Sequence, residues 1–420
     1  MKAWYVVNAY TARNAGDAAI TLGTALVAAE ADGAGIHVAT RYHHRDAAFY
    51  RGHGISCGPP PVAFPIRGTR RGLGAWRLVV LMVSFVTGLI LAIAYRVSPR
   101  LARPFLRGEA NRGLKEMLAA DRVVIAGGGY LYSSRRRFNL TLLHCLACML
   151  LPMVAGLHPV MMPQSVGPAG RFDRTLIGMV LRKLGRVTVR ERRSFEFVRD
   201  ALHVRKVAIC PDAAFALDGD LPHPEQVFAA GTTVGVAPMD WSWSRATSAE
   251  ALPRYTRKMA VVVRELNRAG HAVRLLASSR VDEQDQDDLA IGREIAAQAI
   301  RSGATDVALV ETRTVDEFIA ALLGVNVVVG TRLHACILAI AHGRAAVAIG
   351  YQPKTAGTYE LLELRDYVHD VETFDPGRIA AQVDALIREP SRVTPFEHAR
   401  IRARERLLTY YGELCRNDRP

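Results

Sequence analysis

An arginine and a histidine interrupt an apolar stretch of this 420-residue chain, and their side chains suit anion binding and proton transfer. Residues 327–354 read VVVGTRLHACILAIAHGRAAVAIGYQPK, in which Arg332 and His334 flank Leu333. Arginine keeps its charge, so burying it without a partner is costly. A guanidinium can bind the oxygen pair of a carboxylate or phosphate, and a nearby imidazole can act as general acid or base. The alternative is a surface arginine beside a structural histidine that caps a loop.

The same stretch predicts a helix that begins near Thr331 and ends near Gly343. Thr331 is the expected N-cap, and Leu333, Ile337 and Ile340 recur at helical spacing as core residues. A helix start offers unpaired N–H groups and the positive end of a dipole, which suit a phosphate. Gly343 is the expected terminator.

Five further turns with polar or glycine residues follow apolar runs. They contain Gly16 and Asp17; Gly127, Gly128 and Gly129; Gln164; Arg190; and Asp212. In open α/β sheets, ligands bind at the carboxyl ends of parallel strands. One such turn needs only ordinary loop chemistry, but six together favour an active crevice. Asp17 and Asp212 are candidates to activate or orient a hydroxyl, although an aspartate after a strand equally often caps a helix.

Alternation of short β-rich runs with helical patterns predicts an α/β fold with parallel sheets in two Rossmann-like lobes. The runs include residues 3–9, 121–129, 158–167, 186–192, 206–214, 232–240, 271–279, 306–312, 325–334 and 344–351. Thr314 and Glu317 form a capping box ahead of one helix. The polar stretch at 218–226 is the expected boundary between an N-terminal lobe, 1–222, and a C-terminal lobe, 223–395. A basic helix over 396–420 follows them.

Charge and cysteine content narrow the choice of partners and compartment. The 54 lysines and arginines exceed the 40 acidic residues, a formal charge of +14 that suits anionic small molecules or lipid. Nucleic acid is not an expected partner, because the chain has no reader motif and no basic stripe interleaved with aromatics. Six cysteines without secreted-scaffold spacing indicate a reducing compartment. The Cys145-x-x-Cys148 pair reads as small core residues rather than as a metal or redox site, so neither metal nor cofactor is expected.

An apolar segment at 78–95 predicts contact with a membrane. It carries no charge over about 18 residues, the lower limit for a span. Arginines flank it on both sides, and the strands before and after it, 3–7 and 122–126, are expected in one sheet. We therefore expect a monotopic or re-entrant element, or a helix docked on the membrane, with a buried core helix as the alternative. MKAWYVV reads as a first strand rather than a signal peptide, so the expected location is the cytoplasm, at the inner face of the cytoplasmic membrane.

In its motifs the chain resembles the polysaccharide pyruvyl transferase family. The matching pieces are NAGDAAI, VVIAGGGYLY, PQSVGP, VRERRS, CPDAAF, TRLHACILAIAHG and IGYQPKTAG, between about Asn8 and Gly357. Their order is the specific signal, above all the R-L-H unit followed by Tyr351-x-x-Lys354. The chain departs from the family pattern at Gly343-Arg344-Ala345, where G-x-P is usual, and in PDAAF, which lacks a second proline.

The resemblance implies a two-lobed fold similar to the GT-B glycosyltransferases and transfer of a pyruvyl group from phosphoenolpyruvate to a sugar, forming a cyclic ketal. It also implies that Arg190, Arg332, Leu333 and His334 contact phosphoenolpyruvate. We expect His334 to act as general acid or base, Lys354 to meet an anion, and Tyr351 to pack or orient. The acceptor is a sugar, with a lipid-linked form left open.

Three other functions remain to be weighed. A GT-B glycosyltransferase that uses a nucleotide sugar explains the lobes and the glycine turns, but it does not need the R-L-H unit. A non-catalytic membrane scaffold predicts no turnover. A dinucleotide oxidoreductase is disfavoured, because the glycine triplet is not G-x-G-x-x-G and no strand-end acid follows about 20 residues later.

Overall fold

The chain forms two compact units in a computed structural model that describes residues 2–64, 74–133, 139–217, 232–241, 250–278, 280–281 and 286–417. Unit 1 comprises Met1–Thr11, Ile20–Ala213 and Leu407–Pro420, and unit 2 comprises Ala12–Ala19 and Ala214–Arg406. The predicted boundary at 218–226 lies outside the described residues. A short early segment, Ala12–Ala19, is thus grouped with the later half of the chain.

Unit 1 holds two parallel sheets with buried β-branched strands. The first has the order β3-β2-β1-β4-β6 and the second β5-β7-β8-β9. Their strands are β1 (Lys2–Ala9), β2 (Ala34–Thr40), β3 (Ser56–Gly58), β4 (Arg122–Ile125), β5 (Gly128–Leu131), β6 (Val160–Met161), β7 (Gln164–Val166), β8 (Val187–Val189) and β9 (Val207–Ile209).

Two neighbouring strands each change sheet at a short break. β4 pairs with β6 in the first sheet, and after two residues each the chain continues as β5 and β7, which pair in the second sheet. The predicted turns at Gly127–Gly129 and Gln164 are therefore corrected, since Gly128 and Gln164 start strands and lie opposite each other in register. A β-carbon on Gly127 would lie 2.8 Å from the carbonyl oxygen of Pro163, so only glycine permits this approach of two backbones.

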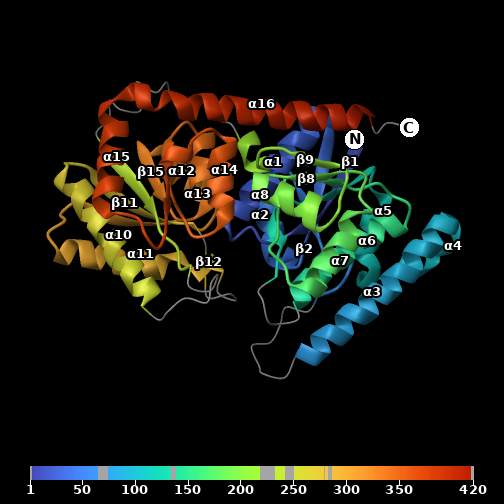
Figure 1. Cartoon of the computed structure of the whole chain (residues 1–420). Coiled ribbons are helices and arrows are strands. Elements are labelled where there is room, and N and C mark those ends of the chain that lie inside the picture. Colours follow the sequence, from blue (N-terminus) through green and yellow to red (C-terminus); the bar gives the residue numbers. More distant parts are fainter. Residues whose placement is uncertain are drawn as a thin grey trace. The chain divides into compact units, whose positions relative to one another are not determined.

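Helices connect the strands of unit 1, and α3 lies along its edge beside α6 (Figure 1). The helices are α1 (Ala15–Asp32), α2 (His43–Gly52), α3 (Gly74–Val97), α4 (Pro99–Ala102), α5 (Arg112–Ala119), α6 (Leu140–Val154), α7 (Arg171–Leu181) and α8 (Arg192–Glu196). The apolar segment at 78–95 falls inside α3. By length and composition, Trp76–Val97 is the one helix among the described residues that is able to cross a membrane.

Unit 2 is built on one parallel sheet of order β14-β11-β10-β15-β16-β17. Its strands are β10 (Thr233–Ala237), β11 (Ala272–Ala277), β14 (Val307–Glu311), β15 (Val327–Gly330), β16 (Ala345–Gly350) and β17 (Val368–Asp370), and a separate antiparallel pair is formed by β12 (Arg280–Val281) and β13 (Gln286–Asp287). The central strands β15 and β16 are apolar throughout and almost wholly buried, as expected for a parallel sheet covered on both faces.

The helices of unit 2 follow the strands in alternation. They are α10 (Ala251–Arg268), α11 (Asp288–Arg301), α12 (Val315–Leu323), α13 (Leu333–Ala341), α14 (Pro353–Leu361), α15 (Pro376–Arg388) and the first part of α16 (Thr394–Asn417). Thr314 caps α12 as predicted, because its hydroxyl accepts from the backbone N–H of Glu317. Gly343 follows α13 with φ +70°, the left-handed conformation that a terminating glycine supplies. The predicted α/β fold with parallel sheets is confirmed.

Candidate active site

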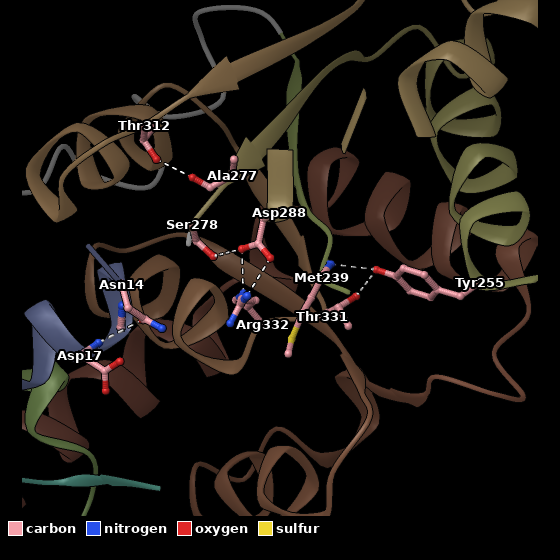
Figure 2. Close-up of polar contacts among 11 residues, drawn as sticks. Asn14, Asp17, Met239, Tyr255, Ala277, Ser278, Asp288, Thr312, Thr331 and Arg332 are labelled. Atoms are coloured by element: carbon pink, nitrogen blue, oxygen red, sulfur yellow. Dashed lines mark hydrogen bonds and ion pairs between the residues drawn. The ribbon is translucent and has the colours of Figure 1, made fainter. Parts of the chain in front are cut away.

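Arg332 lies between β15 and α13, and both nitrogens of its fork are bound by a buried carboxylate. Nε donates to one oxygen of Asp288 at 2.7 Å, and Nη2 donates to the other at 2.8 Å. The Asp288 side chain has no exposed surface, and the Arg332 side chain is 12% exposed. Ser278 donates a third hydrogen bond to the same carboxylate, at 3.1 Å (Figure 2).

The ion pair with Asp288 offsets the free-energy cost of burying the Arg332 guanidinium. Burial raises the pKa of Asp288, and the Arg332 guanidinium and the Ser278 hydroxyl act in the opposite sense. Burial opposes the charged form of Arg332, but Asp288 outweighs it and raises the pKa of Arg332 above its ordinary value. Arg332 is therefore charged and held in one orientation. The expectation that its fork binds a ligand is revised, since only Nη1 is not engaged by Asp288.

The end of β15 is fixed by a second buried contact. The hydroxyl of Thr331 is hydrogen-bonded to that of Tyr255 at 2.7 Å, and the Tyr255 oxygen also accepts from the N–H of Met239 at 3.4 Å (Figure 2). The expectation that Thr331 caps α13 is wrong, because its hydroxyl is used by Tyr255. Arg332 takes the N-cap position, with extended backbone and no side-chain cap.

His334 is packed against the start of α1. A β-carbon on Gly16 would lie 2.5 Å from both Cγ and Nδ1 of His334, closer than any side chain allows. The side chain of Asn14 accepts from the N–H groups of Gly16 and Asp17 and so begins the helix. The N–H of Ala15 donates to the carbonyl of Ser278 at 3.1 Å, which ties this turn to the residue that supports Asp288.

Asp17 and Tyr351 lie close enough to Arg332 to affect its charge, and Lys354 lies over the ring of Tyr351. Asp17 and Tyr351 both act to raise the pKa of Arg332, after the larger effects of burial and Asp288. Tyr351 is 4% exposed, and the ammonium of Lys354 lies 5.7 Å from the centre of its ring. Lys354 is half-buried in the first turn of α14. The structure thus brings together six of the predicted residues in unit 2: Asp17, Arg332, Leu333, His334, Tyr351 and Lys354.

The other predicted residues lie in unit 1, where Arg190 and Asp212 bind each other. Arg190 Nη1 forms an ion pair with Asp212, and Arg190 Nε donates to the hydroxyl of Ser165 at 2.8 Å. Each of the paired side chains is 1% exposed. The N–H of Arg190 donates to the carbonyl of Gln164, a fully buried residue whose side chain lies beside Gly128. The predicted convergence of Arg190 and His334 on one anion stays a prediction.

Three residues that support the site were not predicted from the sequence: Asn14, Ser278 and Asp288. Asp288 is one of five acids in the run 282–288, and nothing in that run marks it as the partner of Arg332. Asn14 is the first residue of the NAGDAAI motif, and asparagine is a common N-cap, so its capping role could have been predicted from the sequence. Among the described residues, no group of three or more His, Cys, Asp or Glu is placed to hold a metal ion.

Comparison with known proteins places these motifs in a family. A family model described as polysaccharide pyruvyl transferase matches residues 14–353, a range that contains every predicted site residue except Lys354. Among curated proteins, the amylovoran biosynthesis protein AmsJ of Erwinia amylovora is 25% identical over 260 residues, which are 59% of this chain and 62% of that protein. The chain therefore matches less than two thirds of the length of that relative.

Solved structures with the same fold cover almost the whole chain. HepE of Anabaena in complex with UDP has a TM-score of 0.57 at 12% identity, over 99% of both chains. UDP-GlcNAc 2-epimerase of Neisseria meningitidis bound to UDP-GlcNAc has a TM-score of 0.57 at 10% identity, also over 99% of both chains. At these identities the likeness shows the fold alone, and it confirms the predicted two-lobed, GT-B-like architecture.

Proposed function

Because the chain belongs to the polysaccharide pyruvyl transferase family, we propose that it moves a pyruvyl group from phosphoenolpyruvate to a sugar. The acceptor is a sugar of a polysaccharide or of its lipid-linked precursor, and the product is a cyclic ketal. The proposal is supported chiefly by the pre-oriented Arg332 beside His334 at the carboxyl end of β15, where open α/β sheets bind their ligands.

The donor carries a phosphate and a carboxylate, so its site needs positive groups at close range. Both candidate arginines already carry a buried carboxylate partner, Asp288 for Arg332 and Asp212 for Arg190. We assign donor binding to Lys354, to the first N–H groups of α13 and to Nη1 of Arg332. Asp288 already holds Arg332 in one orientation. The side chain therefore loses little conformational freedom when an anion binds to Nη1, which lowers the cost of binding.

The two sugar hydroxyls lose two protons in this reaction. One balances the proton that is added to the methylene carbon, and the other leaves with the phosphate. Protonation of the methylene carbon makes the adjacent carbon electrophilic, and one sugar hydroxyl attacks there and loses its proton. The bond to the phosphate oxygen breaks, a second hydroxyl closes the ketal, and its proton leaves with the phosphate. His334 is the assigned general acid or base, and Asp17 is the candidate to orient an acceptor hydroxyl. Tyr351 orients Lys354 through their contact.

A GT-B glycosyltransferase that uses a nucleotide sugar is the second candidate, because HepE and the epimerase were solved with UDP or UDP-GlcNAc on the same fold. A non-catalytic scaffold is the third. We place the enzyme in the cytoplasm at the inner face of the membrane, an assignment supported by the apolar helix α3 and the formal charge of +14.

A donor screen by thermal unfolding separates these candidates. The purified full chain is melted with phosphoenolpyruvate, with UDP-GlcNAc and with inorganic phosphate, since a ligand that binds only the folded state raises the melting temperature. We expect phosphoenolpyruvate to shift the melting temperature more than phosphate at equal concentration, and to be consumed with release of phosphate when glycan acceptors are added. A shift with UDP-GlcNAc alone would overturn the proposal in favour of a glycosyltransferase. A shift with phosphoenolpyruvate but no turnover on any glycan would favour the scaffold.

A further inference from the structure

Helix α3 exposes a continuous apolar stripe. Eight large apolar side chains on it are between 46% and 77% exposed: Trp76, Val79, Met82, Val83, Val86, Ile90, Ile93 and Val97. They recur every three or four residues and so occupy one face of the helix. Soluble monomers seldom expose an apolar surface of this length unless it contacts something.

The opposite face of α3 is fastened to unit 1. Leu81, Leu91 and Ala92 are buried in its core. Gly88 lets the helix approach α6, since a β-carbon there would lie 3.1 Å from Cδ1 of Leu151. The N–H of Ala63 donates to the Ser84 hydroxyl at 2.8 Å, and the hydroxyl of Tyr95 donates to the carbonyl of Leu118 at 3.0 Å. Because one side of α3 is packed against the core of unit 1, lipid cannot surround the helix, although it is long enough to span a bilayer.

The charge around the stripe is of one sign. Between Asp46 and Glu109 the sequence has no acidic residue and nine arginines, of which five lie in α3 or in the short helical stretch just after it: Arg77, Arg96, Arg100, Arg103 and Arg107. Phe105, in the same stretch, is 69% exposed. Exposed apolar side chains beside arginine suit a surface that is apolar inside and anionic at its boundary. Two copies of this segment packed face to face would instead bring like charges together.

We propose that α3 is a monotopic membrane anchor. Its apolar stripe inserts at the boundary between headgroups and acyl chains of a bilayer that contains anionic lipid, and the arginines contact lipid phosphates. The inference concerns a surface of unit 1 alone. It goes beyond pyruvyl transfer and holds or fails independently of that reaction.

Vesicle flotation tests the anchor with a matched pair of variants. The full chain is mixed with phosphatidylcholine vesicles, with or without about 30% phosphatidylglycerol, at low and high salt. We expect binding to the anionic vesicles, weakened by salt. Ile90→Glu should lower the partition coefficient at least about tenfold, because it removes apolar contact and adds a charge. Ile300→Glu is the control, since Ile300 on α11 is 52% exposed against 61% for Ile90.

The arginines are tested separately from the stripe. Arg100→Gln combined with Arg103→Gln should weaken binding to anionic vesicles and leave binding to neutral vesicles unchanged. Circular dichroism melting confirms that each variant folds, which is expected because the substituted side chains are exposed.

Two results would overturn the anchor. One is equal flotation of the wild type, Ile90→Glu and Ile300→Glu. The other is a dimer by light scattering that Ile90→Glu dissociates while no form of the protein floats, which would assign the stripe to a second copy of the chain. Neither result bears on phosphate release with a soluble glycan acceptor, so a failed anchor and a failed pyruvyl transfer give different readouts.

Discussion

His334 and Gly16 show how a single missing side chain can position a candidate catalytic group. The sequence marked His334 because it broke an apolar helix pattern, and marked Gly16 as part of a turn. It gave no sign that the two touch, because they are more than 300 residues apart. In the structure the absent β-carbon of Gly16 provides the space that the imidazole fills.

Gly16→Ala should displace the His334 ring while the fold persists. A β-carbon 2.5 Å from Cγ and Nδ1 forces the ring to shift, and a misplacement of about 1 Å typically costs about a hundredfold in rate. Phosphate release from phosphoenolpyruvate measures the effect. Gly35→Ala is the control, because a β-carbon there meets nothing within 4 Å. Equal rates for the two variants would remove Gly16 from the site.

His334→Ala tests the assigned proton transfer itself. Loss of a general acid or base costs about 10² to 10⁴ in rate, and the melting temperature should stay close to that of the wild type because the ring is half-buried rather than a core residue. Initial rates of phosphate release and a thermal melt are sufficient. A rate within a few-fold of the wild type would show that another group moves the proton.

Asp288 supports Arg332, and the sequence could not distinguish it from four neighbouring acids. Asp288→Asn leaves the buried guanidinium without its counter-charge, so the free energy of unfolding should fall by about 3 kcal/mol. Asp306→Asn removes an exposed partner of Arg274, whose side-chain pair is 31% and 59% exposed, and should cost less than about 1 kcal/mol. Urea denaturation compares the two. Similar costs would mean that the Arg332 pair contributes no more than a surface pair.

At the scale of elements, apolar runs predicted most strands but not where strands begin and end. The apolar runs at β10, β15 and β16 are unambiguous because both faces of these strands are almost wholly buried. β2, β3 and β17 were not marked. Gly127–Gly129 and Gln164 were interpreted as turn residues, but strands resume at Gly128 and Gln164 in another sheet. The hydrophobic periodicity and the β-propensity of a segment do not indicate which sheet its strand joins.

The carboxyl end of β15 depends on a buried hydroxyl pair that sequence patterns did not reveal. Thr331→Val keeps the shape but leaves the Tyr255 hydroxyl without its 2.7 Å partner, so the free energy of unfolding should fall by about 1–2 kcal/mol. Thr175→Val is the matched control, because the Thr175 hydroxyl donates to the carbonyl of Arg171 on an exposed part of α7. Denaturant titration gives both values, and a loss confined to the control would refute the role of the pair.

At the scale of the molecule, the family resemblance predicts that Arg190 and Arg332 both contact the donor. A double-mutant cycle on Arg190→Lys and Arg332→Lys tests this, with phosphoenolpyruvate affinity as the measured quantity. Groups that share a ligand couple by about 0.5–3 kcal/mol, whereas independent sites are additive within about 0.5 kcal/mol. We expect coupling in that range.

The control for this cycle is Arg344→Lys, because Arg344 is also buried but bonds to the carbonyl of Leu323, away from the candidate site. Its effect should add to that of Arg332→Lys. Additivity in the Arg190 cycle as well would separate Arg190 from the donor site and leave the residues of unit 2 to bind phosphoenolpyruvate alone.

The grouping of Ala12–Ala19 with unit 2 has a consequence for how the protein is made. Ala15 emerges from the ribosome early, yet its hydrogen-bond partner Ser278 and the neighbouring His334 are synthesised much later. These contacts therefore cannot form while the chain is still growing through its first half, and the folding of the candidate site is late and long-range. A protein divided near residue 220 and produced as two fragments would carry the segment Ala12–Ala19 on the fragment that does not contain its partners.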